Sequence, residues 1–96
     1  MNNKIYIAGQ VSGIAYEEAF LNFARAEMYW SRKGYDVVNP TRLCDKSWGW
    51  WRYMAVCLWN LLKCDGVYFM ANWKYSRGAR IEYQVAKLLN KDIFLK

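Results

Sequence analysis

The stretch KIYIAGQVSG, residues 4–13, decides the fold. Residues 4–8 form a short, apolar, β-branched run that stops at Gly9, which is typical of a buried strand. Ser12-Gly13 marks a loop, and the apolar periodicity over residues 16–33 predicts a helix that ends at a glycine. A strand, a glycine-containing loop and a helix in this order are the opening of a βαβ unit.

The rest of the chain repeats this alternation. We expect strands over residues 35–38, 66–70 and 92–95, helices over 50–63 and 77–90, and loops over 41–47 and 72–76. The positions expected to face the core are Phe20, Phe23, Ala24, Glu27 and Trp30 in the first helix, Met54, Cys57, Leu58, Leu61 and Leu62 in the second, and Ile81, Val85, Leu88 and Leu89 in the third. This order predicts the α/β class: a single-domain, Rossmann-like (flavodoxin-like) three-layer sandwich over residues 1–96, with a four-stranded parallel sheet and helices on both faces.

Composition narrows the class of protein. No apolar run approaches the roughly 18 residues of a membrane-spanning helix, and the N-terminus lacks the pattern of a signal peptide. We therefore expect a cytoplasmic protein without a membrane partner. Histidine is absent, which removes imidazole bases and most zinc sites, and the three cysteines form no CxxC motif. The spacing of Gly9 and Gly13 is not the G-x-G-x-x-G pattern of dinucleotide sites, so we expect no metal and no cofactor.

The charge balance favours anionic ligands only weakly. The chain has 14 Lys+Arg and 8 Asp+Glu residues, a net charge of +6, which also serves solubility. No basic run or nucleic-acid motif is present, so a nucleic-acid partner is not expected. Ligands of open parallel sheets bind beyond the carboxyl ends of the strands, which here means residues 9–13, 39–51 and 71–77 and the start of the third helix. Asp65 opens the third strand at the opposite rim, where we expect a structural role.

The start of the third helix carries unusual charges. Arg77 and Arg80 stand in its first turn, where the positive end of the helix dipole favours acidic residues. With Ser76 and the Gly78 backbone they would form a phosphate cradle, although two solvated arginines remain an equal alternative. Glu82 follows close to the apolar face, where a buried carboxylate needs a partner and can act as a nucleophile or an electrostatic stabiliser; the alternative is an exposed surface charge near Lys87.

Aromatic residues are abundant, and three tryptophans gather at one point of this rim. Trp48, Trp50 and Trp51 could stack a nucleobase, cap the core or fill a dimer interface. Six tryptophans in 96 residues exceed what one small core readily covers. We therefore expect a homodimer or higher homo-oligomer, with the stretch 48–59 as the contact.

In combination these segments resemble the nucleoside 2-deoxyribosyltransferase superfamily over nearly the whole chain, and most closely its small bacterial and phage domains. Among the relatives are 2′-deoxynucleoside 5′-phosphate N-hydrolases. The resemblance rests on residues 4–9 with Ser12-Gly13, on residues 34–40 and 64–68, and on Trp73 with residues 76–83.

The resemblance implies a site. Glu82 matches the nucleophile that attacks the anomeric carbon, and Tyr6 matches the tyrosine that orients it. The substrate-binding residues would be Gly9, Ser12, Gly13, Asn39, Trp50, Trp73, Ser76, Arg77, Gly78 and Arg80. The pattern departs at Cys57, where the superfamily has an aspartate that protonates the leaving base. Cys57 is a poor replacement acid and has a second interpretation as a small core residue, and Asp45 is the one nearby rim carboxylate that could substitute.

Two functions follow as hypotheses. The first is a nucleoside or nucleotide N-glycosidic bond hydrolase or deoxyribosyltransferase that acts through Glu82. The second is a catalytically weak or inactive protein that senses or sequesters a nucleotide in the same pocket, because Cys57 has replaced the acid. We expect phosphorylated nucleosides to bind better than unphosphorylated ones in either case.

Overall fold

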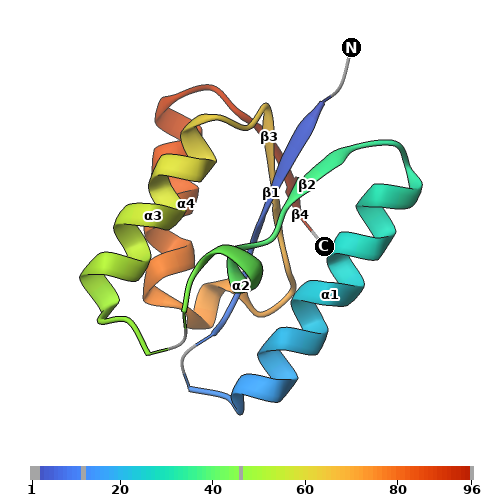
Figure 1. The fold of residues 1–96 in the computed structure, drawn as a ribbon. Helices are drawn as coiled ribbons and strands as arrows, with labels where there is room; N and C mark the ends of the chain where they lie inside the picture. The colour runs from blue at the N-terminus through green and yellow to red at the C-terminus, as the bar shows by residue number, and fades with distance from the viewer. Residues whose placement is uncertain (1–2, 12, 46, 96) are drawn as a thin grey trace.

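The computed structural model describes residues 3–11, 13–45 and 47–95. In chain order its elements are β1 (Lys4–Ala8), α1 (Tyr16–Arg32), β2 (Asp36–Val38), α2 (Pro40–Leu43), α3 (Trp50–Leu62), β3 (Gly66–Phe69), the 3-10 helix η1 (Trp73–Tyr75), α4 (Arg77–Leu88) and β4 (Asp92–Leu95). The ribbon forms three layers, with α1 on one side of the sheet and α3 and α4 on the other (Figure 1).

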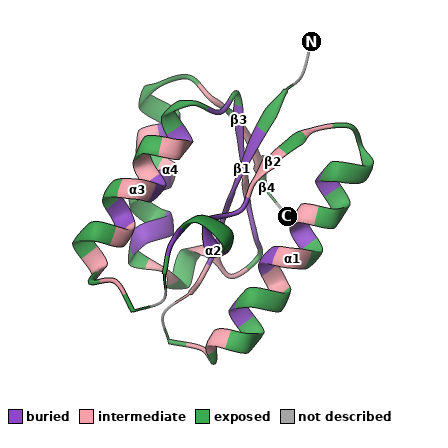
Figure 2. Cartoon of the chain, in the orientation of Figure 1, coloured by how far each residue is buried: buried purple, intermediate pink, exposed green. Residues whose placement is uncertain are grey.

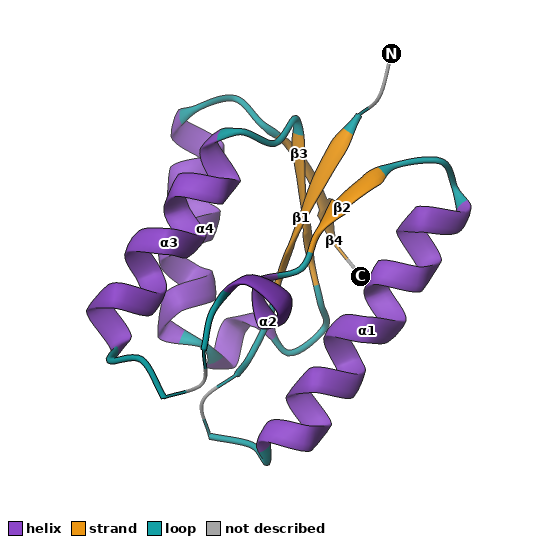
Figure 3. Cartoon of the chain, viewed as in Figure 1, coloured by secondary structure: helices purple, strands orange, loops and turns teal. Residues whose placement is uncertain are grey.

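The sheet has four strands in the order β2-β1-β3-β4, and all its pairs are parallel. Ile5 pairs with Val37 on one side and with Gly66 on the other, and Gly66 pairs with Asp92. Helices connect the strands and lie on both sides of the sheet, which forms the middle layer (Figure 3). The predicted α/β, Rossmann-like fold with a four-stranded parallel sheet is confirmed.

Alternate residues of β1 enter two separate cores, as the two-residue period of a strand requires. Tyr6 and Ala8 belong to a cluster on the side of α3 and α4, together with Leu61 and Phe69. On the other side Ile7 packs in a second cluster, whose remaining buried members are Phe23, Ala26 and Met70. The buried residues accordingly follow the central strands and the inward stripe of each helix (Figure 2).

Element ends agree with the expectations to within two residues, and two segments expected to be loops contain helical turns. The segment 41–47 includes part of α2, whose start the sequence signals: Asn39 caps it by accepting a hydrogen bond from the Thr41 amide, and Pro40 occupies the first turn. Residues Trp73–Tyr75 form η1 inside the expected loop 72–76. Gly34, after α1, has a φ of 95°, which fits the predicted helix end.

The buried face of α4 differs from the expected one. Of the four expected positions, Val85 is half-buried and packs against the core cluster, whereas Ile81, Leu88 and Leu89 are exposed, with 81% of Leu88 accessible. The buried residues of α4 are instead Gly78, Ala79, Glu82 and Ala86. Close packing contributes at the start of the helix, where a Cβ atom at Gly78 would lie 2.8 Å from the Met54 sulfur of α3. Phe20 of α1 and Leu62 of α3, also expected inside, are exposed as well.

Within the described ranges no helix is both long and apolar enough to cross a membrane.

Candidate functional site

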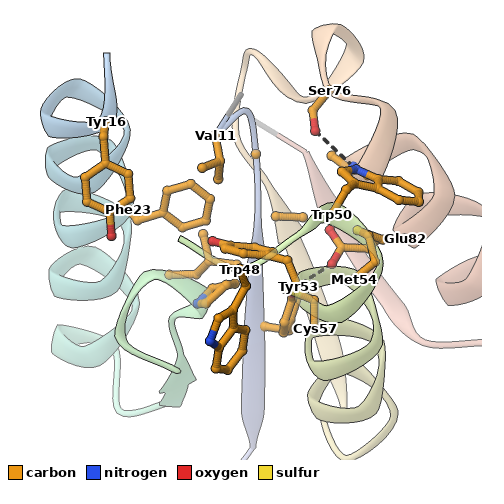
Figure 4. A pocket seen from close by; sticks show the side chains of 17 residues that line it. Val11, Tyr16, Phe23, Trp48, Trp50, Tyr53, Met54, Cys57, Ser76 and Glu82 are labelled. Atoms are coloured by element: carbon orange, nitrogen blue, oxygen red, sulfur yellow. Dashed lines mark hydrogen bonds between the residues drawn. The ribbon is translucent and has the colours of Figure 1, made fainter. Parts of the chain in front are cut away.

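A pocket of about 370 Å³ lies where β1 ends and where α3 and α4 begin. The residues that line it are Tyr6, Ile7, Ala8, Gly9, Val11, Tyr16, Phe23, Pro40, Trp48, Trp50, Tyr53, Met54, Cys57, Ser76, Gly78, Ala79 and Glu82. Figure 4 shows their side chains converging from α1, the loop before α3, α3 and α4. The volume is in the usual range of small-molecule sites, and the position at the strand ends is where the topology predicts one.

A hydrogen-bonded pair, Tyr6 and Glu82, lies in the pocket wall. The Tyr6 hydroxyl on β1 donates to Oε2 of Glu82 on α4 over 2.6 Å, and the two residues are 1% and 5% exposed. Burial raises the pKa of Glu82 to about 8, even though the Tyr6 hydrogen bond lowers it. Burial and then the Glu82 charge raise the pKa of Tyr6 well above its ordinary value. A pKa of about 8 favours the protonated form of Glu82 at neutral pH.

For Cys57 the sequence left a choice between a position in the site and a position in the core, and the structure shows both. It is 3% exposed and part of the core cluster on the α3 and α4 side, and it also lines the pocket. Its sulfur lies 3.8 Å from the sulfur of Cys44. Burial, followed by the charge of Glu82, raises the pKa of the Cys57 thiol well above its ordinary value. Such a thiol is a weak acid, and protonating a departing base nitrogen requires a much stronger one.

The start of α4 carries the basic groups. The Arg77 guanidinium lies 4.1 Å from the centre of the Trp50 ring, an arrangement that orients its planar donor edge. Ser76 caps the helix by accepting a hydrogen bond from the Ala79 amide over 3.1 Å. Arg80 is exposed and does not line the pocket.

Six of the twelve residues predicted from the sequence line the pocket: Tyr6, Gly9, Trp50, Ser76, Gly78 and Glu82. Five others lie elsewhere: Gly13, Asn39, Trp73, Arg77 and Arg80. Asn39 is buried and hydrogen-bonds Glu27 and Thr41, while Trp73 stacks on Tyr83 with ring centres 4.7 Å apart. Ser12 lies outside the described residues.

Carboxylates other than Glu82 stay outside the pocket lining. Asp45, the suggested substitute acid, is exposed and accepts a hydrogen bond from the Ser47 amide. Asp65 accepts one from the Lys4 amide at the amino end of β1, which agrees with the structural role expected for it. The described residues hold no group of three or more His, Cys, Asp or Glu side chains that could bind a metal ion.

Tyr53 and Tyr16 are lining residues that the sequence did not single out. Tyr53 could have been found, because it precedes Cys57 by four positions on α3 and so shares its face. Its hydroxyl is buried and has no hydrogen-bond partner within the described part of the chain. Tyr16 begins α1, and only the fold brings that end of the helix to the pocket.

The fold and the pocket define a Rossmann-like α/β protein with a cavity of small-molecule size at the carboxyl ends of its parallel strands. Over residues 3–95 the chain matches the family described as a domain of unknown function, DUF4406, and it belongs to that family. The comparison with curated proteins finds no match.

Proposed function

We propose that this protein breaks the N-glycosidic bond of a nucleoside or nucleotide, with Glu82 as the nucleophile. The deoxyribosyl group would then pass either to water, in a hydrolase, or to another base, in a deoxyribosyltransferase. The observation that carries the proposal is the Tyr6–Glu82 hydrogen bond of 2.6 Å in the wall of an aromatic pocket. A buried carboxyl held in one orientation beside a ligand-sized space is a typical nucleophile. The resemblance of the sequence to the nucleoside 2-deoxyribosyltransferase superfamily, in which a glutamate at this position attacks the sugar, supports the same assignment.

The chemistry assigns one role to each group. Ionised Glu82 attacks C1′ as the bond to the base breaks, and it stabilises the positive charge that develops on the sugar. Tyr6 holds the second carboxyl oxygen and fixes the direction of attack. Water or an acceptor base then releases the sugar from the ester. Ser76, Gly78 and Arg77 at the start of α4 suit a 5′-phosphate at the mouth of the pocket.

A second candidate function is nucleotide binding with little or no catalysis. Cys57 favours it, because its buried thiol replaces the acid that the superfamily uses, and so does the raised pKa of Glu82. A protein of this kind would sense or sequester a nucleotide in the same pocket.

We also propose that the protein is a homo-oligomer, namely a dimer that forms through α3. Trp51 and Trp59 of this helix are 78% and 61% exposed, and both fall in the stretch 48–59 expected to form the contact. Sedimentation at micromolar concentration tests this, since a particle of 11.5 kDa would be a monomer and would contradict it.

The two functions are separated by one set of measurements. 2′-Deoxynucleoside 5′-monophosphates are incubated with the protein and release of the free base is followed, while calorimetry measures binding of each nucleotide and of its unphosphorylated nucleoside. Release of base that Glu82→Gln abolishes supports the enzyme. Binding without release supports the second candidate function, and absence of both binding and release contradicts both candidate functions.

The monophosphate should bind about tenfold more tightly than the nucleoside, since charge-assisted hydrogen bonds contribute about 1.5–3 kcal/mol.

A further inference from the structure

The charges around the pocket are unequally distributed. Glu82 is its single ionisable carboxyl, and none of the described lining residues is a lysine or an arginine. The other polar side chains there are hydroxyls, a thiol and indole groups. Arg77 lies outside the lining, against the Trp50 ring. The one carboxyl of the lining thus lies inside the pocket, whereas the basic side chains of Arg52 and Arg77 stack on the lining residues Trp48 and Trp50 and are not themselves part of the lining.

This distribution leaves a reaction incomplete. Cleavage of a bond to a neutral base normally requires two groups of the protein. An ionised carboxylate attacks or stabilises the sugar, and an acid protonates the leaving nitrogen. Glu82 can fill the first role. Among the described lining residues no second carboxyl is present for the other, and the remaining candidates are the Cys57 thiol and the hydroxyls of tyrosines.

We propose that the substrates are N-glycosides whose base already carries a positive charge in its ring, such as N-substituted pyridinium or N7-alkylated purinium nucleotides. The inference rests on the proposed function and names the substrate class of that same site. Its basis is the combination of one buried carboxyl, no second acid and an aromatic lining.

A cationic base removes the need for a proton donor. When the Glu82 carboxylate forms its bond to C1′, the C1′–N bond breaks and its electron pair neutralises the ring nitrogen. The base leaves uncharged and without a proton. Water then cleaves the sugar ester, which gives the free sugar, the Glu82 carboxylate and one proton released to solvent.

The lining suits such a ring. Six aromatic side chains line the space: Tyr6, Tyr16, Phe23, Trp48, Trp50 and Tyr53. Figure 4 labels all of them except Tyr6. Aromatic faces attract cations, and two of these rings already hold planar guanidinium groups, Arg52 over Trp48 at 4.2 Å and Arg77 over Trp50 at 4.1 Å. The cationic ring would also bring Glu82 the positive partner that the described lining does not supply, and so favour its ionised form.

A matched pair of ligands tests the inference. The probes are the 5′-monophosphates of nicotinamide riboside and nicotinamide 2′-deoxyriboside, each as the oxidised pyridinium and as the uncharged 1,4-dihydro form of nearly the same shape. Calorimetry gives the affinities, and chromatography follows release of nicotinamide by the wild type and by Glu82→Gln. We expect the wild type to bind a pyridinium form at least tenfold more tightly than its dihydro form and to release nicotinamide from it. Glu82→Gln should reduce the preference to less than threefold and stop the release.

The outcomes separate this inference from the proposed function. Equal affinity of the wild type for the pyridinium and dihydro forms overturns the inference. Faster cleavage of neutral-base deoxynucleotides than of both pyridinium nucleotides also overturns it. The proposed function survives either result. If no nucleotide of either charge binds or is cleaved, the proposed function fails and the inference fails with it.

Discussion

The two faces of the sheet are built for different tasks. On the face covered by α3 and α4, the buried residues include a carboxyl, a phenol and thiols, and the pocket opens there. On the other face, α1 packs through aromatic rings: Trp30 has Tyr35, Tyr68 and Phe94 as neighbours with ring centres 5.0–5.4 Å away. Because side chains of a strand alternate, Tyr6 enters the first environment and Ile7 the second. Within β1 the titratable side chain and the purely apolar one thus belong to different core clusters, although α1 also contributes Tyr16 and Phe23 to the pocket lining.

The largest expected effect is on the face with the pocket. Glu82→Gln should lower glycosidic cleavage by about 10²–10⁴-fold or more, because it removes the charge that attacks the sugar and keeps the shape. Glu27→Gln, the same change on α1, should alter turnover by less than about twofold. Steady-state rates of both variants check this, and comparable losses in the two would remove the functional contrast between the faces.

Stability should depend on pH through the same carboxyl. Glu82 has a folded pKa of about 8, whereas an unfolded glutamate titrates near about 4.3. Between these values the unfolded chain releases the proton and the folded chain keeps it, so the free energy of unfolding should fall as pH rises from about 4.5 to 8, by up to about 1.4 kcal/mol per pH unit. The groups that face Glu82, namely Tyr6, Cys57, Cys44 and Tyr53, have raised pKa values and add nothing in this range.

Urea unfolding at several pH values measures this dependence. In Glu82→Gln the fall should be absent, so that the variant is more stable than the wild type at pH 8. Parallel curves for the two proteins would show that Glu82 ionises normally in the folded state.

Cys57→Asp should lower the free energy of unfolding by about 2–4 kcal/mol, because it places a second carboxyl beside Glu82 and Cys44 in a buried position. In the folded fraction the new acid should increase cleavage of deoxynucleoside 5′-monophosphates, since it can protonate a neutral base. Cys57→Ser is the control and should give no gain in turnover. Thermal melting and turnover are measured on the same preparations; unchanged melting with unchanged turnover would show that position 57 is neither packed nor part of the site.

The smallest effect is expected for Trp30→Phe on the α1 face. The Trp30 indole nitrogen is buried without a hydrogen-bond partner among the described residues. Trp30→Phe keeps an aromatic ring and removes that unsatisfied N–H, so gain and lost packing should nearly cancel, within about 1 kcal/mol. Trp30→Ala should cost about 3–5 kcal/mol. Denaturant titration compares the two, and equal losses would mean that the N–H has a partner.

The sequence predicts the order of elements well because strand and helix periods and the glycine and proline signals are local. It predicts Tyr6 and Glu82 as partners only through the resemblance to a known family; β1 and α4 are 76 positions apart at this pair, and no local pattern joins them. On α4 the expected core positions Ile81 and Leu88 are exposed. Hydrophobicity favoured them, whereas the face that meets α3 begins with Gly78, whose close approach to the Met54 side chain is set by another helix and is not visible in the local sequence.

The fluorescence of different tryptophans should report on different parts of the molecule. Trp30, which has aromatic rings as neighbours on the α1 face, is not among the residues that line the pocket, and its emission should report unfolding. Trp48 and Trp50 line the pocket, each with a guanidinium against one face, and a planar ligand that enters would change their surroundings. The protein thus contains its own fluorophores for two separate events, so that occupancy and folding can be followed in one sample without any label.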